Sequence, residues 1–306
     1  MKAKNDITEL VGNTPMVKLH SVINPINRVY AKLEFYNPTA SLKDRAALEM
    51  VEQAEASGRL KSGGTIIEAT SGNTGIALAF IAAARKYKLT LVMPESMSIE
   101  RQKLLALLGA NLELTPADMG MKGAIDKAQE LHQSLTNSIL IKQFDNQANV
   151  DAHAKHTAME LLNDSEGELD YLFIPVGTGG TLMGCAQTLK KKIPQLKIIA
   201  VEPADSPVLS GGLPGPHLIQ GIGAPFVPTI LDQTLIDGVV TVENDEAFDE
   251  TRNVCKKEGI LAGLTSGAGI AAVNKYVKAH KIENKSIVLF FCDSAERYLS
   301  LEKLFQ

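Results

Sequence analysis

Two kinds of hydrophobic pattern alternate along nearly the whole chain. Short apolar, β-rich runs predict strands, and segments with apolar residues at helical spacing predict helices. The expected strands are residues 29–34, 65–69, 89–93, 111–114, 139–141, 171–176, 198–202, 239–242 and 286–291. The expected helices are residues 46–57, 76–86, 99–108, 122–135, 182–192, 245–258 and 267–279. This alternation predicts an α/β fold of open, twisted, mostly parallel sheets with helices on both faces.

The chain length and one polar stretch indicate how these elements are divided. A chain of 306 residues favours two domains, because single cores rarely grow beyond about 250–300 residues. The polar stretch 145–149 separates the two sets of elements. Residues 203–228 are rich in glycine and proline, which predicts a long loop beside a ligand site. In parallel sheets such sites lie at the carboxyl ends of the strands.

The composition narrows the function classes. The chain is 45% hydrophobic and 22% charged with a net charge of -4, which gives no electrostatic footprint for nucleic acid or an anionic membrane. No apolar run approaches the ~18 residues of a membrane span, and no signal-peptide core follows the N-terminus. Three scattered cysteines without a C-x-x-C pair are typical of reduced thiols, so we expect a cytoplasmic protein. The six histidines have no metal-ligand spacing, and we expect no metal.

Lys43 is the first candidate for chemistry. Ser41 and Asp44 fit a capping box ahead of the helix expected over residues 46–57, which places Lys43 in the first helical turn. Unpaired N–H groups there favour a neutral amine, the form that attacks a carbonyl. Asp44 favours the ammonium instead, so the direction of the pKa shift stays open. Most lysines in such positions only decorate the surface, and the glycine-rich turns further along set this one apart.

A glycine-rich turn directly follows the strand expected over residues 171–176 and opens a helix. Its residues are Gly177, Thr178, Gly179, Gly180 and Thr181. Backbone N–H groups at a helix start can hold a phosphate, and glycines permit close approach. Two other interpretations stay open. In the first, the turn binds nothing. In the second, it binds a dinucleotide, and Glu202 binds the ribose. The dinucleotide motif G-x-G-x-x-G, however, needs glycine at position 182, which is Leu182.

Two further turns share this strand-to-helix arrangement, over residues 70–75 and 263–268. The first is dense in hydroxyl and amide donors, which suit a carboxylate. A phosphate cup, a carboxylate clamp, a ring partner and an amine nucleophile together favour pyridoxal 5'-phosphate as the cofactor.

From Ile7–Pro15 to Glu296–Ser300 the chain closely resembles the cysteine synthase (O-acetylserine sulfhydrylase) family. This family lies within the tryptophan-synthase-like (fold type II) pyridoxal phosphate enzymes. The motifs that carry the resemblance are Ser41–Arg45, Thr70–Gly75, Gln143–Phe144, Gly177–Thr181 and Gln220–Gly223. One departure is Gln147, which stands where the family usually has proline.

The resemblance implies a role for each motif. Lys43 is implied as the catalytic residue, linked covalently to the cofactor. The other implied cofactor-binding residues are Asn73 at the ring hydroxyl, Gly177, Thr178, Gly179, Gly180 and Thr181 at the phosphate, and Ser266 at the pyridine nitrogen. The implied substrate-binding residues are Thr70, Ser71, Thr74 and Gln143 at the carboxylate and Gly221 near the amine.

The implied reaction is β-replacement of O-acetyl-L-serine with sulfide, giving L-cysteine and acetate. A hydroxyl at the ring nitrogen makes the cofactor a weaker electron sink, which suits elimination from Cβ. A cystathionine β-synthase-like enzyme or an O-phosphoserine sulfhydrylase would use the same chemistry. From other classes, a nicotinamide-dependent dehydrogenase or a cofactor-free binding module stays open.

The resemblance also implies an organisation. We expect residues 1–41 and 150–306 to form a larger cofactor-phosphate domain, and residues 42–149 a smaller mobile substrate-carboxylate domain. The active site is expected in the cleft between them. A homodimer is expected, with serine acetyltransferase as a further candidate partner, small-molecule substrates, and neither nucleic acid nor membrane.

Overall fold

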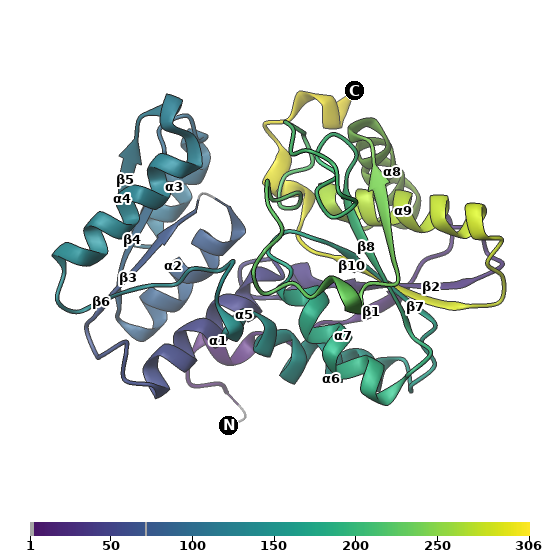
Figure 1. Cartoon of the computed structure of the whole chain (residues 1–306), viewed down its shortest axis with the longest axis horizontal. Coiled ribbons are helices and arrows are strands. Elements are labelled where there is room, and N and C mark those ends of the chain that lie inside the picture. Colours follow the sequence, from purple (N-terminus) through teal and green to yellow (C-terminus); the bar gives the residue numbers. More distant parts are fainter. Residues whose placement is uncertain (1–2, 71) are drawn as a thin grey trace. The chain divides into compact units, whose positions relative to one another are not determined.

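The computed structural model describes residues 3–70 and 72–306 (Figure 1). The chain divides into two compact units. The first unit takes in the chain up to Val11 and Lys43–Asn149, and the second takes in Gly12–Leu42 and Val150–Gln306.

The N-terminal segment differs from the expected division, which placed residues 1–41 wholly in the larger domain. The 3-10 helix η1 (Ile7–Leu10) belongs to the first unit, where it contacts helix α2 (Asn73–Arg85). The guanidinium of Arg85 donates to the hydroxyl of Thr8 over 3.4 Å, and Val11 packs against the core of this unit. Long-range packing therefore holds the segment in the first unit.

The first unit is built on a four-stranded, fully parallel sheet. Its strand order is β5 (Asn111–Thr115), β4 (Lys88–Pro94), β3 (Thr65–Ala69) and β6 (Ser138–Leu140). Ile66 packs in the same core as helices α1 (Lys43–Ala56) and α2, whereas Ile67 packs with helix α4 (Gly120–Ser134). Because successive side chains of a strand point to opposite faces, the sheet has helices on both sides. Helix α3 (Ile99–Leu107) links β4 to β5.

The second unit is built on a six-stranded sheet that is parallel except for its first strand. Its order is β1 (Met16–Lys18), β2 (Arg28–Leu33), β10 (Ser286–Phe291), β7 (Tyr171–Pro175), β8 (Lys197–Pro203) and β9 (Gly238–Val242). Phe291 packs with helices α8 (Asn244–Glu258) and α9 (Leu264–His280), and Phe290 packs with α6 (Ala158–Asp164) and α7 (Gly180–Lys192). The predicted α/β fold with mostly parallel sheets is confirmed.

The α-helical segment after residue 146 was not predicted. Helix α5 (Gln147–Ala152) begins in the polar stretch that separated the two sets, and a π-helical turn η4 (His153–Thr157) joins it to α6. Helix α7 packs closely on this segment, since a Cβ built on Gly184 would lie 2.4 Å from the carbonyl oxygen of Val150. The glycine is therefore required for the approach.

A buried lysine ties strand β2 to helix α6. The ammonium of Lys32 donates to the carbonyl oxygen of Thr14 over 2.6 Å and to the carboxylate of Asp164 over 2.8 Å. A carboxylate oxygen of Glu160 lies 3.0 Å away. Burying the charge is tolerable because all these partners are present.

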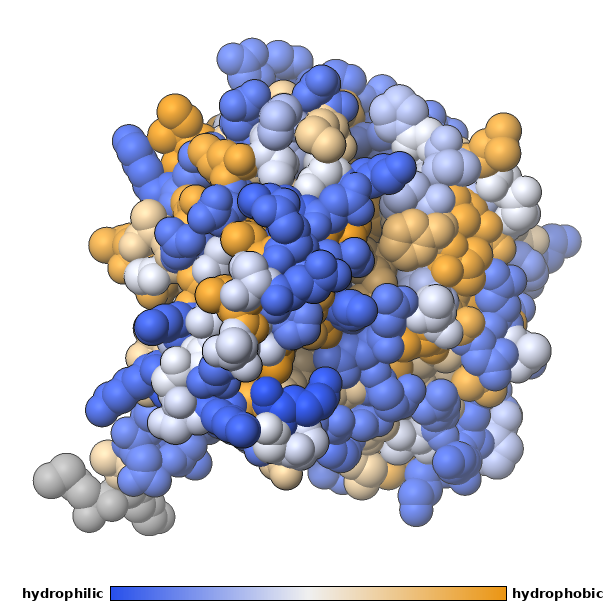
Figure 2. Space-filling model, turned by 60° about the vertical axis from the view of Figure 1, so that its left-hand side comes forward, coloured by the Kyte–Doolittle hydropathy of each residue, from blue (hydrophilic) through white to orange (hydrophobic). Residues whose placement is uncertain are grey.

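The surface mixes hydrophobic and hydrophilic residues. On the face drawn in Figure 2, hydrophobic residues are scattered among hydrophilic ones. Exposed apolar side chains of the first unit include Ile99, Leu107 and Leu114. Across residues 3–70 and 72–306, no helix is both long enough and apolar enough to cross a membrane.

Candidate active site

Lys43 is the first residue of helix α1 and so lies in the first helical turn, as the sequence predicted, although the helix begins three residues earlier than expected. Its side chain is half-buried, and Ala46, Ala47 and Met50 of the same helix are buried in the core of the first unit. The core therefore fixes the helix whose first turn carries the amine.

The turn over residues 70–75 leads from strand β3 into helix α2. The N–H of Thr70 donates to the carbonyl oxygen of Val92 over 3.1 Å, which continues the β3–β4 pairing into the turn. Thr70 and Thr74 are buried, and Asn73 begins the helix with its side chain half-buried. The helix start supplies the anion-attracting N–H groups that the sequence predicted. Ser71, the fourth predicted carboxylate ligand, lies outside the described residues.

Gln143 comes to this turn from the far end of the first unit's sequence. The hydroxyl of Thr74 donates to the side-chain oxygen of Gln143 over 2.7 Å. An amide whose oxygen is used in this way keeps its NH₂ group as the donor toward a ligand. The structure thus brings together two residues from distant motifs that the resemblance implied as carboxylate ligands.

A buried carboxylate, Glu68, binds the backbone next to the Gln143 side chain. The sequence did not indicate this contact. Glu68 accepts from the backbone N–H of Lys142 over 2.9 Å and from that of Gln143 over 3.5 Å. Burial raises the pKa of Glu68 to about 7, the two N–H groups oppose this shift, and the charge of Asp145 adds to it. In the sequence Glu68 appeared only as a polar residue inside a strand.

The turn predicted to hold a phosphate joins strand β7 to helix α7 in the second unit. Gly179 caps the helix in the left-handed region with φ 85°, and a Cβ on Gly177 would lie 2.5 Å from the carbonyl oxygen of Gly221. Both positions therefore require glycine. Thr178 and Thr181 are buried at this turn. The start of α7 offers N–H groups suited to an anion, which is consistent with the predicted phosphate cup.

His153 is a second residue that the sequence did not indicate. Its Nε2 lies 3.2 Å from the hydroxyl of Thr181, and its Nδ1 lies 2.9 Å from the hydroxyl of Thr157. The ring is buried, so these contacts fix the Thr181 side chain in the predicted phosphate cup. In the sequence His153 lies outside the motifs and gave no sign of this contact.

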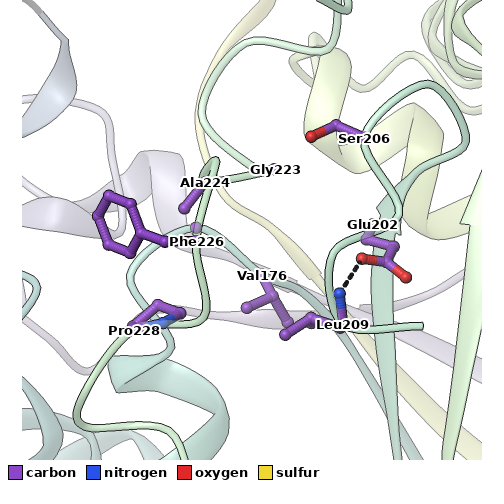
Figure 3. A pocket seen from close by; sticks show the side chains of 9 residues that line it. Val176, Glu202, Ser206, Leu209, Gly223, Ala224, Phe226 and Pro228 are labelled. Atoms are coloured by element: carbon purple, nitrogen blue, oxygen red, sulfur yellow. Dashed lines mark hydrogen bonds between the residues drawn. The ribbon is translucent and has the colours of Figure 1, made fainter. Parts of the chain in front are cut away.

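Beside the predicted phosphate turn the second unit has a small, open hollow, drawn in Figure 3 and lined by Val176, Gly177 and Phe226 among others. Glu202 lies at its edge and accepts from the backbone N–H groups of Leu209 over 2.7 Å and Ser210 over 2.9 Å. The hydroxyl of Ser210 donates to the same carboxylate over 2.5 Å. The Glu202 carboxylate is thus occupied by the loop after β8. It is not available to bind a ribose, which argues against the dinucleotide interpretation.

The third turn places Ser266 in the first turn of helix α9. Ser266 is fully buried, and its hydroxyl has no hydrogen-bond partner among the described residues. A Cβ on Gly221 would lie 3.5 Å from the methyl group of Thr265. Gly221 therefore lies beside both the phosphate turn and the start of α9. Because buried hydroxyls are normally paired, the Ser266 hydroxyl is a group that a ligand would satisfy.

Comparison with known proteins decides the family. The sequence matches the family described as "Pyridoxal-phosphate dependent enzyme" over residues 7–293. The chain belongs to this family. It is therefore a pyridoxal phosphate-dependent enzyme, as its three turns and Lys43 predicted.

Similar proteins span nearly the whole chain. A "Cysteine synthase" from Flavobacterium sp. is 56% identical, over 86% of this chain and 85% of its own. "Cysteine synthase B" of Campylobacter jejuni is 48% identical over 99% of both chains. The crystal structure of cysteine synthase from Entamoeba histolytica is 42% identical with a TM-score of 0.95, covering 99% of this chain and 91% of its own.

The residues of the second unit fit the phosphate and the ring of such a cofactor. The cup over residues 177–181 can hold a phosphate through its N–H groups and hydroxyls. The buried hydroxyl of Ser266 offers a partner to a ring nitrogen. In the first unit, Lys43 is the one amine among the predicted site residues, and an amine can form an imine with the aldehyde of the cofactor.

Proposed function

We propose that the chain is a cysteine synthase, which replaces the acetoxy group on Cβ of O-acetyl-L-serine with sulfide and releases L-cysteine and acetate. The observation that carries the proposal is the 48% identity to "Cysteine synthase B" over 99% of both chains. The pairing of Thr74 with Gln143 supports it, because an amino-acid substrate needs a carboxylate site.

Each predicted residue has a part in this reaction. Pyridoxal phosphate supplies an aldehyde for amines and a ring that withdraws electrons from the carbon bearing the amine. Lys43 holds the cofactor, takes the proton from Cα of the amino acid and later returns it. Thr70, Ser71, Thr74 and Gln143 bind the substrate carboxylate, while Gly221 lies by the amine. Acetate leaves from Cβ, and sulfide adds at the same carbon.

The cofactor is held by the remaining predicted residues. Residues 177–181 bind its phosphate, and Asn73 binds the ring hydroxyl. The Ser266 hydroxyl, unlike a carboxylate, leaves the ring nitrogen without a permanent proton, which favours elimination over transamination. We propose that the first unit binds the substrate carboxylate and the second unit the cofactor phosphate. Mobility of the smaller unit stays a prediction.

A second candidate uses another nucleophile or leaving group. The O-acetylserine-dependent cystathionine β-synthase of Helicobacter pylori is 39% identical with a TM-score of 0.90, covering 98% of both chains. A structure of O-ureido-L-serine synthase is 40% identical with a TM-score of 0.95, covering 99% of this chain and 96% of its own. An O-phosphoserine sulfhydrylase belongs to the same group of alternatives. In this chain these reactions would use the same predicted residues and would differ in the leaving group or the nucleophile at Cβ.

We further propose a cytoplasmic homodimer, with serine acetyltransferase as a candidate partner. No disulfide joins the three cysteines in the described part of the chain, which is consistent with a reducing compartment. The family resemblance supports the dimer and the partner.

The first test is spectroscopic. The purified protein should absorb visible light through its lysine-linked cofactor, and borohydride should abolish the band by reducing the link. Lys43→Ala should lose the band and all turnover, whereas Lys61→Ala, a change at an exposed lysine, should keep both. A borohydride-sensitive band in Lys43→Ala would assign the link to another lysine.

The second test separates the candidate reactions. Rates are compared for O-acetylserine, serine and O-phosphoserine as first substrates, each with sulfide or homocysteine. The proposal expects the highest kcat/KM for O-acetylserine with sulfide. A preference for homocysteine or for O-phosphoserine would replace the proposed function by the corresponding alternative.

A further inference from the structure

Glu68 is a buried carboxylate at an unusual place in strand β3. Only 5% of its surface is exposed, and Ile66 and Ile67 of the same strand belong to apolar cores. Burying a carboxylate is costly unless hydrogen bonds compensate for the lost water. Glu68 is the last residue but one of β3, and the turn over residues 70–75 follows the strand.

Among the described residues, the hydrogen bonds of Glu68 all go to one short segment of backbone. One carboxylate oxygen accepts from the N–H of Lys142 over 2.9 Å, and the other accepts from the N–H of Gln143 over 3.5 Å. This segment follows strand β6, the direct neighbour of β3 in the sheet. Lys142 lies in the left-handed region with φ 52°, which is uncommon for a lysine. The carboxylate therefore holds a bend that the segment would not favour by itself.

The bend decides where Gln143 points. The backbone N–H of Gln143 donates to Glu68, and its carbonyl oxygen accepts from the side-chain amide of Asn149 over 2.9 Å. The side-chain oxygen of Gln143 accepts from the hydroxyl of Thr74. Glu68 thus shares with Asn149 and Thr74 the task of fixing one glutamine, which is itself only 7% exposed.

We propose that Glu68 is a positioning residue for amino-acid binding, which holds the backbone at Lys142 and Gln143 so that the Gln143 amide donates to the substrate carboxylate. The inference rests on the proposed function of Gln143. Glu68 itself does not touch the substrate. It acts through the two N–H groups that it binds, and through Gln143 on the ligand.

The test is the variant Glu68→Gln, examined as the cofactor-loaded enzyme. An amide has one oxygen and one NH₂ group, so it cannot accept from both N–H groups as the carboxylate does. L-Alanine serves as the probe, because it has the amine and carboxylate of the substrate but no leaving group. Its dissociation constant, measured by the change in visible absorption, should rise about tenfold, the effect of losing roughly one hydrogen bond to a charged group.

Three readouts distinguish positioning from loss of stability. Cofactor affinity should stay at the parent value. The KM for O-acetylserine should rise while the KM for sulfide stays unchanged. Hydrogen exchange of the backbone amides at 142 and 143 should be faster in the variant. The matched control is Glu258→Gln, which also removes a carboxylate that accepts from consecutive backbone N–H groups, those of His20 and Val22 among them. This control should leave L-alanine binding unchanged.

Each outcome decides something. If the parent binds L-alanine and Glu68→Gln binds it equally well, the inference is overturned and the proposed function is not. A parent that binds no amino acid overturns the proposed function and the inference with it. If Glu68→Gln does not fold, Glu68→Asp is used, which keeps the charge and withdraws it by one methylene. It should also weaken L-alanine binding, and parent-like affinity would overturn the inference.

Discussion

Ser266 buries its hydroxyl at the start of helix α9 without a hydrogen-bond partner in the part of the chain that the structure describes. Leaving a buried polar group unpaired costs about 1–3 kcal/mol. The cofactor-free protein carries this cost, and a ring nitrogen would remove it. At the scale of single residues, the site is thus prepared at the expense of stability.

Ser266→Ala should therefore affect the two forms of the protein in opposite directions. Without cofactor, the variant should be as stable as the parent or more stable by up to about 1 kcal/mol, because an unpaired hydroxyl is removed. Its cofactor affinity should fall by roughly two- to tenfold, the effect of one net hydrogen bond. Urea unfolding and cofactor titration measure both.

Ser286→Ala is the matched control for this prediction. The hydroxyl of Ser286 is also buried but accepts from the guanidinium of Arg28 over 2.9 Å. Removing it should lower stability and leave cofactor affinity unchanged. If Ser266→Ala behaves as Ser286→Ala does, Ser266 is a structural residue.

At the scale of elements, the turn between β7 and α7 joins geometry to chemistry. Gly177 faces the carbonyl oxygen of Gly221, and Gly179 adopts a left-handed conformation that starts the helix. Gly177 thus allows the turn to approach the loop at Gly221, and Gly179 allows helix α7 to begin beside it. The predicted phosphate cup therefore depends on this approach more than on any single side chain.

Gly177→Ala tests the element. Its Cβ would lie 2.5 Å from the Gly221 oxygen, so one of the two loops must move. Overpacking costs about 1–3 kcal/mol, and we expect cofactor affinity to fall by about tenfold or more in titrations monitored by absorption. Gly58→Ala is the control, because Gly58 also needs a left-handed backbone (φ 70°) but has open space around it. It should lose stability and keep cofactor affinity. Equal cofactor affinities in the two variants would contradict a role for close approach.

At the scale of the whole molecule, buried ionisable groups make stability depend on pH. The pKa of Glu68 is raised by burial from 4.5 to about 7 in the folded state. Between these two values the folded state holds a proton that the unfolded state has lost, so this contribution to stability is complete below pH 4.5 and is lost as the pH rises to about 7. The loss is on the order of 3 kcal/mol.

Glu68→Gln should remove this dependence. The free energy of unfolding in urea, measured without cofactor at pH 5, 6 and 7, should fall less with pH in the variant than in the parent. Asp145→Asn should reduce the slope only in part, since the Asp145 charge is a minor cause of the shift. Parallel curves for parent and Glu68→Gln would show that Glu68 titrates near its ordinary pKa.

The sequence by itself determined most elements and the chemistry of the turns. Strands β3 and β10 were predicted from short apolar, β-rich runs, and the start of α1 from Ser41 and Asp44, because both signals lie within a few neighbouring residues. The turn over residues 177–181 was recognisable because glycine has a local conformational role. The family followed from such motifs.

Only the tertiary structure decided which distant residues meet. The segment from α5 to α6 was not predicted, because its buried positions include His153 and Thr157, whose polar side chains hide the helical period and bind each other. Glu68 and Gln143 are 75 positions apart and meet because β3 and β6 are neighbours in the sheet. Periodicity records which side of an element faces a core, whereas strand order and loop contacts depend on packing between elements. For that reason the sequence indicated what the turns can bind, and the fold decided which residues hold them in place.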